Sequence, residues 1–169
     1  MDKNIYLVGF MGTGKTTVGK ILSKELKREF VETDELIEKK ENLDIPAIFS
    51  LKGERYFRKV EKEVLKEVSC KNSLIVSCGG GIVIDKENLS LLKKTGFVVC
   101  LTADASIIYE RTVSYKHRPL LNVDNPLERI KKLLREREPF YKEAHLFIDT
   151  ANISPQDVAT KIIKELNNV

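Results

Sequence analysis

The sequence predicts an α/β fold, a three-layer sandwich in which helices cover a central, about five-stranded parallel sheet. Short apolar runs alternate with amphipathic stretches along the 169 residues. These runs are continuously apolar, as expected for strands that are covered on both faces. A glycine-rich turn joins the first run to a helical pattern. No repeat, low-complexity tract or linker divides the chain, so we expect one domain over residues 1–169.

The expected elements follow this pattern in order. A strand at 5–8 precedes a helix whose apolar residues recur at helical spacing, and further strands are expected at 30–33, 74–77, 97–101 and 146–149. Residues 34–70 form a long insertion that is expected to be helical. A long helix after residue 125 is expected to stop at Pro139. Ser154, Pro155 and Asp157 predict the start of the last helix.

Composition narrows the class of protein. Hydrophobic residues make up 42% of the chain, and 29 basic residues against 25 acidic ones give a formal charge of +4. Acidic residues are interleaved with the basic ones, so the excess suits a small anionic ligand and does not indicate nucleic acid. The start of the chain lacks a signal peptide and no apolar run approaches the ~20 residues that span a bilayer. We therefore expect a cytoplasmic protein that does not enter membranes.

The cysteines and histidines indicate neither disulfides nor zinc. Cys70, Cys78 and Cys100 are odd in number and widely spaced, which predicts buried, reduced thiols. Only two histidines are present, too few for a plausible zinc site.

A phosphate-binding motif directly follows the first strand. Residues 9–16, Gly-Phe-Met-Gly-Thr-Gly-Lys-Thr, fill every fixed position of G-x-x-x-x-G-K-[ST]. Glycines let successive backbone amides point at a phosphate, and the helix that follows adds its positive end. Lys15 would reach the β- and γ-phosphates, and the Thr16 hydroxyl would bind magnesium. A simple glycine-rich turn is the weaker alternative. The predicted nucleotide-binding residues here are Gly12, Thr13, Gly14, Lys15, Thr16 and Thr17.

The helical insertion carries candidate residues for a second ligand. Asp34 lies just past the end of the second strand, at the edge of a parallel sheet where ligands bind. Arg58 and Glu61 are three residues apart beside an apolar face, so the acid could orient the guanidinium for a bidentate anion site. From spacing alone, an ordinary surface ion pair is the favoured interpretation of these two residues.

Three glycines end the third strand. Gly79, Gly80 and Gly81 would allow a ligand to lie against bare backbone, although a tight turn remains an alternative. Ser77, directly before Cys78, would be close enough to reach a magnesium-bound water near Thr16.

Residues 112–125 have poor periodicity and three potentially cationic side chains. A basic flap that closes on phosphates and an exposed connecting loop are equally consistent with this segment. Arg137 falls three residues after Leu134, at the end of an apolar helical stripe. It is therefore better placed for a pocket than for solvent.

Together these residues resemble the shikimate kinase family, in the nucleoside monophosphate kinase-like group of P-loop proteins. The resemblance covers nearly the whole chain. Beyond the phosphate-binding loop it rests on Thr33-Asp34 with Ile37-Glu38, residues 45–49, Gly53-Glu54, Phe57-Arg58 with Glu61, residues 79–81, Arg118-Pro119-Leu120-Leu121, and Arg137 with Pro139 and Tyr141.

The resemblance implies transfer of the ATP γ-phosphoryl group to the 3-hydroxyl of shikimate, in the chorismate pathway to aromatic amino acids. It implies that Asp34 binds the hydroxyls and accepts the proton, and that residues 112–125 are a lid. The carboxylate clamp it implies is Arg58, Arg137 and the Gly80 amide, with Phe49 and Phe57 as pocket walls. It implies that Arg118 reaches over the transferred phosphate and that Arg111 and Pro119 contact adenine.

Two departures from the family pattern concern the nucleotide and its metal. Glu32 replaces the usual aspartate, so the contact to a magnesium-bound water would come from a longer carboxylate. The segment 150–152 lacks the arginine that some relatives place against adenine.

Other functions remain open from the residues themselves. They include a kinase for gluconate, another small polyol or a nucleoside monophosphate, and a nucleotide-dependent binding module without catalysis. We expect a monomer that binds shikimate, ATP and Mg²⁺.

Overall fold

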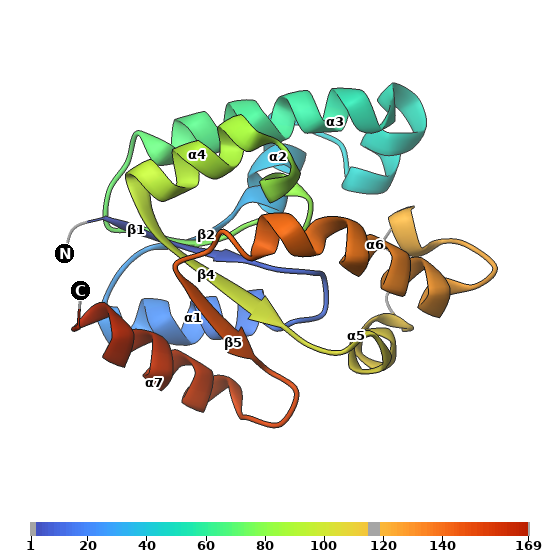
Figure 1. The fold of residues 1–169 in the computed structure, drawn as a ribbon. Coiled ribbons are helices and arrows are strands. Elements are labelled where there is room, and N and C mark those ends of the chain that lie inside the picture. The colour runs from blue at the N-terminus through green and yellow to red at the C-terminus, as the bar shows by residue number, and fades with distance from the viewer. Residues whose placement is uncertain (1–2, 115–118, 169) are drawn as a thin grey trace.

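A computed structural model of the chain describes residues 3–114 and 119–168. The described residues form five parallel strands in the order β2-β3-β1-β4-β5, which confirms the predicted fold class (Figure 1). The strands are β1 (Asn4–Val8), β2 (Phe30–Glu32), β3 (Ile75–Ser77), β4 (Gly96–Thr102) and β5 (Leu146–Asp149). The helices are α1 (Lys15–Leu26), α2 (Thr33–Glu41), α3 (Ile45–Ser69), α4 (Lys86–Thr95), α5 (Ala105–Thr112), α6 (Pro126–Tyr141) and α7 (Pro155–Leu166), with 3₁₀ turns η1 (Ile82–Ile84) and η2 (Pro119–Leu121).

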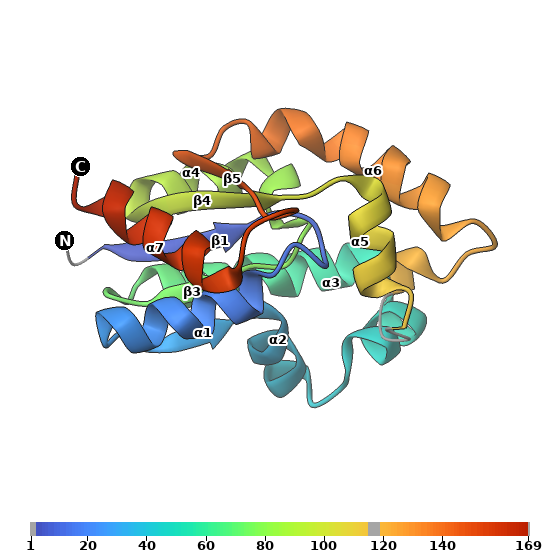
Figure 2. The same ribbon diagram turned by 90° about the horizontal axis from the view of Figure 1, so that it is seen from below.

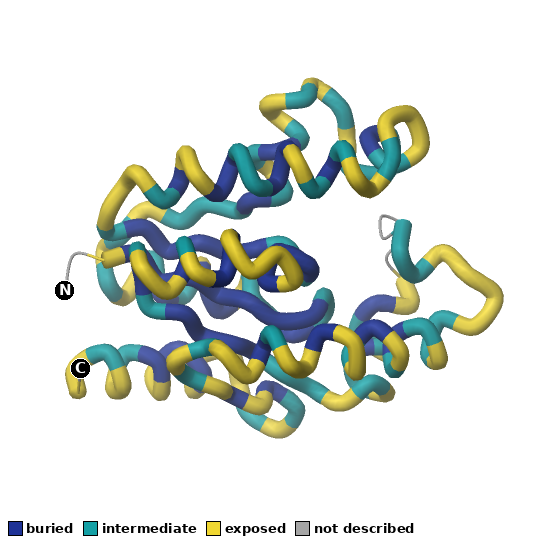
Figure 3. The backbone as a smooth tube through the Cα atoms, turned by 45° about the horizontal axis from the view of Figure 1, so that its top comes forward, coloured by how far each residue is buried: buried dark blue, intermediate teal, exposed yellow. Residues whose placement is uncertain are grey.

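The central strands β1, β3 and β4 are largely buried on both faces because helices form a layer on each side, whereas the edge strands β2 and β5 are partly exposed. Helices α3 and α4 cover one face, whereas α1 and α7 lie side by side on the other (Figures 1 and 2). Successive residues of β1 alternate between two apolar clusters: Tyr6 and Val8 pack towards α3 and α4, and Ile5 and Leu7 pack towards α1 and α7. This explains the continuously apolar strand sequences. Figure 3 shows the buried residues following the strands.

Local signals explain where several helices begin. The Asp44 side chain accepts a hydrogen bond from the Ala47 amide at the start of α3. The Ser154 side chain accepts one from the Asp157 amide, as predicted for α7. Helix α3 is broken at Gly53, whose φ of 82° and ψ of 167° suit glycine alone. The segment that was expected to be helical thus contains α2 and the two parts of α3.

Three expectations about local structure are wrong. Helix α6 runs through Pro139 to Tyr141 instead of stopping at the proline. The amide that Pro139 lacks would have bonded to the Arg135 carbonyl, and both residues are exposed, so water can serve that carbonyl. Cys70 is exposed because it lies just past the end of α3, whereas Cys78 and Cys100 are buried. The second strand ends one residue early because Thr33 already begins α2.

The parallel arrangement brings the carboxyl ends of all five strands to one edge of the sheet. The glycine-rich loop follows β1, Asp34 follows β2, and the three glycines follow β3. The start of β1 and the end of α7 lie at the opposite edge (Figures 1 and 2). Within the residues that the structure describes, no helix is long and apolar enough to cross a bilayer.

Candidate active site

Two adjoining cavities open at the carboxyl edge of the sheet. The larger has a volume of about 640 Å³ and is lined by residues 11–18 together with groups from β2, the β3 end, α5 and the β5–α7 connection. The smaller is lined by α3, the three glycines, η2 and α6. Met11, Asp34, Gly79 and Gly80 line both cavities and therefore form their boundary.

The glycine-rich loop has a backbone conformation that glycine adopts far more readily than other residues. Gly14, the residue before α1, has a φ of 92°, which a side chain would strain. Gly9 has a φ of 130°, and a Cβ there would collide with the Leu101 carbonyl oxygen. Thr13 is buried and its hydroxyl donates to the Phe10 carbonyl at 2.7 Å, which braces the loop.

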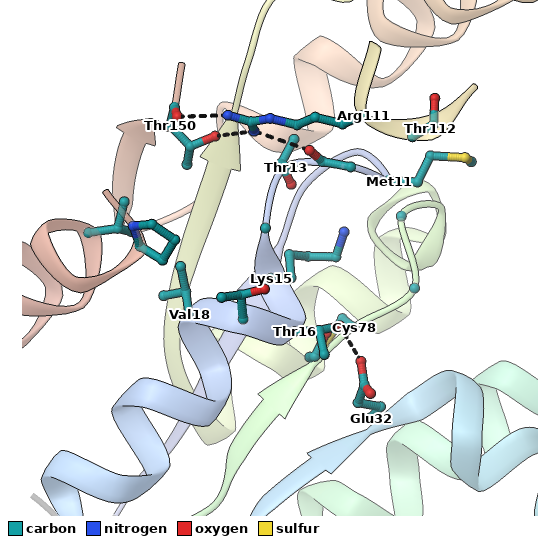
Figure 4. A pocket seen from close by; sticks show the side chains of 18 of the residues that line it. Met11, Thr13, Lys15, Thr16, Val18, Glu32, Cys78, Arg111, Thr112 and Thr150 are labelled. Atoms are coloured by element: carbon teal, nitrogen blue, oxygen red, sulfur yellow. Dashed lines mark hydrogen bonds between the residues drawn. The ribbon is translucent and has the colours of Figure 1, made fainter. Parts of the chain in front are cut away.

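Lys15 and Thr16 project from the first turn of α1 into the larger cavity (Figure 4). Lys15 Nζ donates to the carbonyls of Gly9 and Phe10, each at 2.9 Å. The Thr16 hydroxyl donates to Glu32 Oε1 at 2.5 Å, which leaves lone pairs on its oxygen available to a cation. Ser77 lines the same cavity from the end of β3. Of the residues expected around magnesium, the structure therefore brings Thr16, Glu32 and Ser77 together.

Arg111 at the end of α5 lies across the other side of the larger cavity. Its guanidinium donates to the Gly12 carbonyl at 3.2 Å, to the Thr150 hydroxyl at 3.1 Å and to the Thr150 carbonyl at 3.1 Å (Figure 4). The Thr150 hydroxyl also contacts the Thr102 carbonyl at 3.0 Å. These bonds fix the orientation of the guanidinium plane. The apolar residues Ile153, Pro155 and Val158 line the same cavity.

The smaller cavity contains the Arg58–Glu61 pair. Arg58 Nη1 donates to Glu61 Oε2 at 2.8 Å, and the Glu61 side chain is only 1% exposed, so this is not an ordinary surface pair. Burial raises the pKa of Glu61, and the neighbouring Arg58 opposes that rise. The rings of Phe49 and Phe57 lie 4.8 Å apart and line the cavity beside this pair.

The three glycines lie where the other site residues converge. A Cβ on Gly79 would lie 2.8 Å from Glu61 Oε1 and 2.9 Å from Asp34 Oδ1. On Gly80 it would lie 3.2 Å from Arg137 Nη1, and on Gly81 2.6 Å from Arg58 Nη2. None of the three has a positive φ. Residues 79–82 do form a turn, in which the Ile82 amide donates to the Gly79 carbonyl at 3.1 Å, but without a positive φ this turn does not itself require glycine. Acidic and basic side chains occupy the space beside all three residues, which favours glycine there.

Arg137 is buried deeply for a charged residue, with 2% of its surface exposed. Its guanidinium lies over the ring of Phe10, 5.2 Å from the ring centroid. Among the described residues, neither Nε nor Nη1 has a hydrogen-bond partner. A buried guanidinium with unsatisfied donors that lines a cavity is well suited to bind an anion.

Two of the predicted residues are placed differently or not at all. Pro119 lines the smaller cavity and is not among the residues of the larger one, so this structure does not put it beside the Arg111 plane. Arg118 lies outside the described residues. Thr17 lines the larger cavity, as expected for a residue of the phosphate-binding segment.

Three residues that hold or contact site residues were not predicted from the sequence. Thr33 is fully buried and accepts a hydrogen bond from the Gly79 amide at 2.9 Å, which joins the start of α2 to the glycine segment. Thr150 anchors Arg111, and Phe10 lies beneath Arg137. Because Thr33 directly precedes Asp34 in the chain, its position could have indicated a role in the site. The partners of Thr150 and Phe10 are distant in sequence, and nothing local indicates them.

Comparisons with known proteins agree on one family. The family model described as Shikimate kinase matches residues 11–167. A shikimate kinase from Thermodesulfovibrio yellowstonii is 49% identical over 163 residues, which is 96% of this chain and 94% of the relative. One from Thermoanaerobacter pseudethanolicus is 43% identical over 162 residues, 96% of this chain and 95% of the relative.

A comparison with solved structures identifies the same family. The shikimate kinase from Acinetobacter baumannii, in complex with shikimate, superimposes with a TM-score of 0.96 at 41% identity over 99% of this chain and 94% of that one. A gluconokinase from Sinorhizobium meliloti covers 99% of this chain and 93% of its own with a TM-score of 0.59, but at 12% identity it shows a shared fold alone.

Proposed function

This chain belongs to the shikimate kinase family, and we propose that its larger cavity holds ATP, its smaller cavity shikimate, and Asp34 the reacting hydroxyl between them. It is an ATP-dependent kinase that phosphorylates shikimate on the route to aromatic amino acids. One observation supports this placement above the others: Asp34, Gly79, Gly80 and Met11 line both cavities. The two ligands would therefore meet at a carboxylate.

On the nucleotide side, the amides of the glycine-rich loop would hold the β-phosphate. Lys15 would exchange the Gly9 and Phe10 carbonyls for the β- and γ-phosphates, since a doubly charged phosphate attracts an ammonium group more strongly than a carbonyl does. The adenine ring would lie between the fixed Arg111 plane and the apolar residues near Pro155. Pro119 is not part of this proposed base site.

The oxygens near the loop suit Mg²⁺. This ion prefers oxygen ligands and is usually held by one or two protein groups together with substrate phosphates and water. Thr16 would be the direct protein ligand, and Glu32 and Ser77 would bind its water molecules. When bound, the metal would neutralise charge on the phosphates.

On the acceptor side, Arg58 and Arg137 would bind the carboxylate of shikimate together with the Gly80 amide. Glu61 holds Arg58 in place, and Arg137 has buried donors directed at the cavity. Phe49 and Phe57 would form the apolar wall against the ring. The carboxylate of shikimate would then pair with the two guanidinium groups of the protein, and its hydroxyls with the carboxylate of Asp34.

Asp34 would orient the 3-hydroxyl and accept its proton as the oxygen attacks the γ-phosphorus in line with the departing ADP. The transition state of such a transfer is loose, so the protein mainly positions reactants and neutralises charge. Lys15 supplies positive charge in this arrangement. The same role is proposed for Arg118 on the resemblance to the family, with closure of the 112–125 lid excluding water that would otherwise hydrolyse ATP.

We also propose that the protein works as a monomer, because residues of one chain line both cavities. A cytoplasmic location is supported by the use of ATP and by cysteines that form no disulfide in the described chain. Light scattering after size-exclusion chromatography tests the first proposal.

A coupled assay of ADP release tests the function directly. ATP turnover is expected to be low alone and to rise sharply with shikimate, with one shikimate 3-phosphate formed for each ADP. Gluconate and nucleoside monophosphates serve as competing acceptors in matched reactions. A protein that hydrolyses ATP equally with and without shikimate, or prefers one of the other acceptors, would contradict the assignment.

A further inference from the structure

Tyr141 lies one helical turn beyond Arg137 on α6, and nothing in the reaction described above uses it. Its side chain is 5% exposed, and its hydroxyl donates a 2.7 Å hydrogen bond to the Gly80 carbonyl oxygen. Burial raises the pKa of Tyr141, so the hydroxyl remains a donor at neutral pH. One helix therefore supplies both a guanidinium in the smaller cavity and a donor that holds the glycine segment.

The peptide between Gly80 and Gly81 lies between two guanidinium groups. A Cβ on Gly80 would lie 3.2 Å from Arg137 Nη1, and one on Gly81 would lie within 2.8 Å of three Arg58 guanidinium atoms. No cis peptide bond occurs in the described chain, so the Gly80 carbonyl and the Gly81 N–H point in opposite directions. A carbonyl that is held against Tyr141 thus turns the Gly81 N–H away from α6.

Within residues 3–114 and 119–168, the N–H groups of Gly80 and Gly81 donate to no protein acceptor. The carbonyls on either side are engaged, since the Gly79 oxygen accepts from the Ile82 amide and the Gly81 oxygen accepts from the Ile84 amide. The segment therefore has unpaired N–H donors on residues that line the cavity, while its carbonyl acceptors are occupied. This polarity suits a carboxylate.

A competing arrangement shows why the Gly80 carbonyl needs a holder. Arg137 has buried donors without a partner among the described residues, and an amide oxygen nearby is an available acceptor. If the 80–81 peptide rotated, the Gly80 oxygen could satisfy Arg137 and would then occupy the space of the substrate carboxylate. Glycine lacks the Cβ that would restrict such a rotation.

We propose that Tyr141 is a positioning residue for recognition of the acceptor's carboxylate: it keeps the Gly80 carbonyl oxygen paired with its own hydroxyl, so that Nε and Nη1 of Arg137 and the free amides remain available to that carboxylate. This inference rests on the proposed function of the smaller cavity. It assigns to Tyr141 a role in specificity in addition to its packing in the core.

Tyr141→Phe tests the role because it removes the hydroxyl and keeps the ring. We expect KM for shikimate to rise about two- to tenfold, the range for one net hydrogen bond, with kcat and KM for ATP within twofold of the wild type. The decisive measurement compares shikimate with its analogue in which CH₂OH replaces the carboxylate. The preference for shikimate in kcat/KM is expected to shrink by the same factor as KM rises.

Tyr6→Phe is the matched control. Tyr6 is also buried, and its hydroxyl contacts Asn4 Nδ2 at 3.0 Å and Thr95 Oγ1 at 2.9 Å, at the opposite edge of the sheet. Its loss should lower the melting temperature and leave the preference for the carboxylate unchanged. If Tyr141→Phe behaves in the same way, Tyr141 is merely structural and the proposal is overturned.

A measurement on the wild-type protein keeps the test independent of variant folding. On titration with shikimate, the amide signals of Gly80 and Gly81 in ¹H–¹⁵N NMR spectra are expected to shift downfield, and to shift much less with the alcohol analogue. Equal responses to both compounds would contradict the proposal. If the wild type turns over no shikimate at all, the proposed function fails, whereas normal turnover with an unchanged Tyr141→Phe preference removes the role of Tyr141 alone.

Discussion

The two cavities are suited to anions by different means. The larger includes one continuous segment, residues 11–18, which offers backbone amides and the first side chains of α1, and it is completed by residues from β2, α2, the β3 end, α5 and the β5–α7 connection. The smaller takes its polar groups from four distant places: Asp34 on α2, Arg58 and Glu61 on α3, the glycines after β3, and Arg137 on α6. The larger site is therefore partly local in sequence, whereas the polar groups of the smaller one come together only in the folded chain.

The two sites therefore differ in the free-energy cost that their polar groups impose on the folded protein. Backbone amides need an unusual loop conformation, which glycines permit at small cost. Buried side-chain charges must be desolvated, and their cost is met by partners such as Glu61 for Arg58 or by the ligand itself. The acceptor cavity should therefore be sensitive to single side-chain changes, whereas the nucleotide loop should be sensitive mainly to backbone changes.

Asp34→Asn is expected to have the largest effect, because Asp34 lines both cavities. Asparagine keeps the size and can still hydrogen-bond a hydroxyl, but it cannot accept the proton, so kcat should fall by about 10²- to 10⁴-fold. The dissociation constant for ADP, measured by calorimetry, should stay within twofold. Asp85→Asn, which removes a carboxylate at the start of α4 outside both cavities, is the control. Unchanged turnover in Asp34→Asn would remove the assigned role.

How far the sequence predicts each site follows from the same contrast. The phosphate-binding motif can be recognised from the sequence alone, because its glycines, Lys15 and Thr16 are neighbours in the chain. Spacing also placed Arg137 in a pocket. It could not predict that Asp34 and Glu61 both approach Gly79, that Thr150 fixes Arg111, or that α6 continues through Pro139. Those features depend on contacts between residues far apart in sequence, or on which helix face meets water.

Arg58→Lys tests whether the smaller cavity depends on the shape of a guanidinium group in addition to its charge. Lysine keeps the charge but loses the planar fork that can bind a carboxylate with two hydrogen bonds. A charge-assisted hydrogen bond is worth about 1.5–3 kcal/mol, so KM for shikimate should rise on the order of 10- to 100-fold while KM for ATP changes little. Arg55→Lys, at an exposed position on the same helix, should change neither constant. An unaltered KM for shikimate in Arg58→Lys would contradict the clamp.

Two glycine substitutions test whether the larger cavity depends on backbone conformation and the smaller one on its side chains. At Gly14 a Cβ would have open space, yet its φ of 92° would be strained by about 1–2 kcal/mol, so Gly14→Ala should raise KM for ATP roughly 3- to 30-fold. At Gly79 the backbone is unstrained, but a methyl group would collide with Glu61 and Asp34. Gly79→Ala should therefore raise KM for shikimate. If both variants impaired the same substrate, the distinction between backbone and side-chain sites would be wrong.

The smallest expected effect lies at the opposite edge of the sheet, away from both cavities. His145 precedes β5, and its Nδ1 accepts a 3.0 Å hydrogen bond from the Val98 amide while its own amide donates to the Val98 carbonyl. Burial lowers the pKa of His145, and Lys93 and Lys3 add to this; Lys93 also contacts Glu143 at 3.0 Å. The folded state thus favours the neutral ring, which can accept that bond.

Because the folded pKa lies below the unfolded value of about 6.5, the stabilisation from neutral His145 is present above that pH and is lost as pH falls through the folded pKa. Loss of one hydrogen bond, about 0.5–1.5 kcal/mol, should lower the melting temperature by roughly 1–6 °C between pH 7.5 and pH 5. His145→Asn places an oxygen near the position of Nδ1 without a titrating ring, so this part of the pH dependence should disappear in calorimetric scans. An identical pH profile in the variant would show that His145 contributes nothing to it, whereas altered KM values at neutral pH would show that this edge communicates with the cavities.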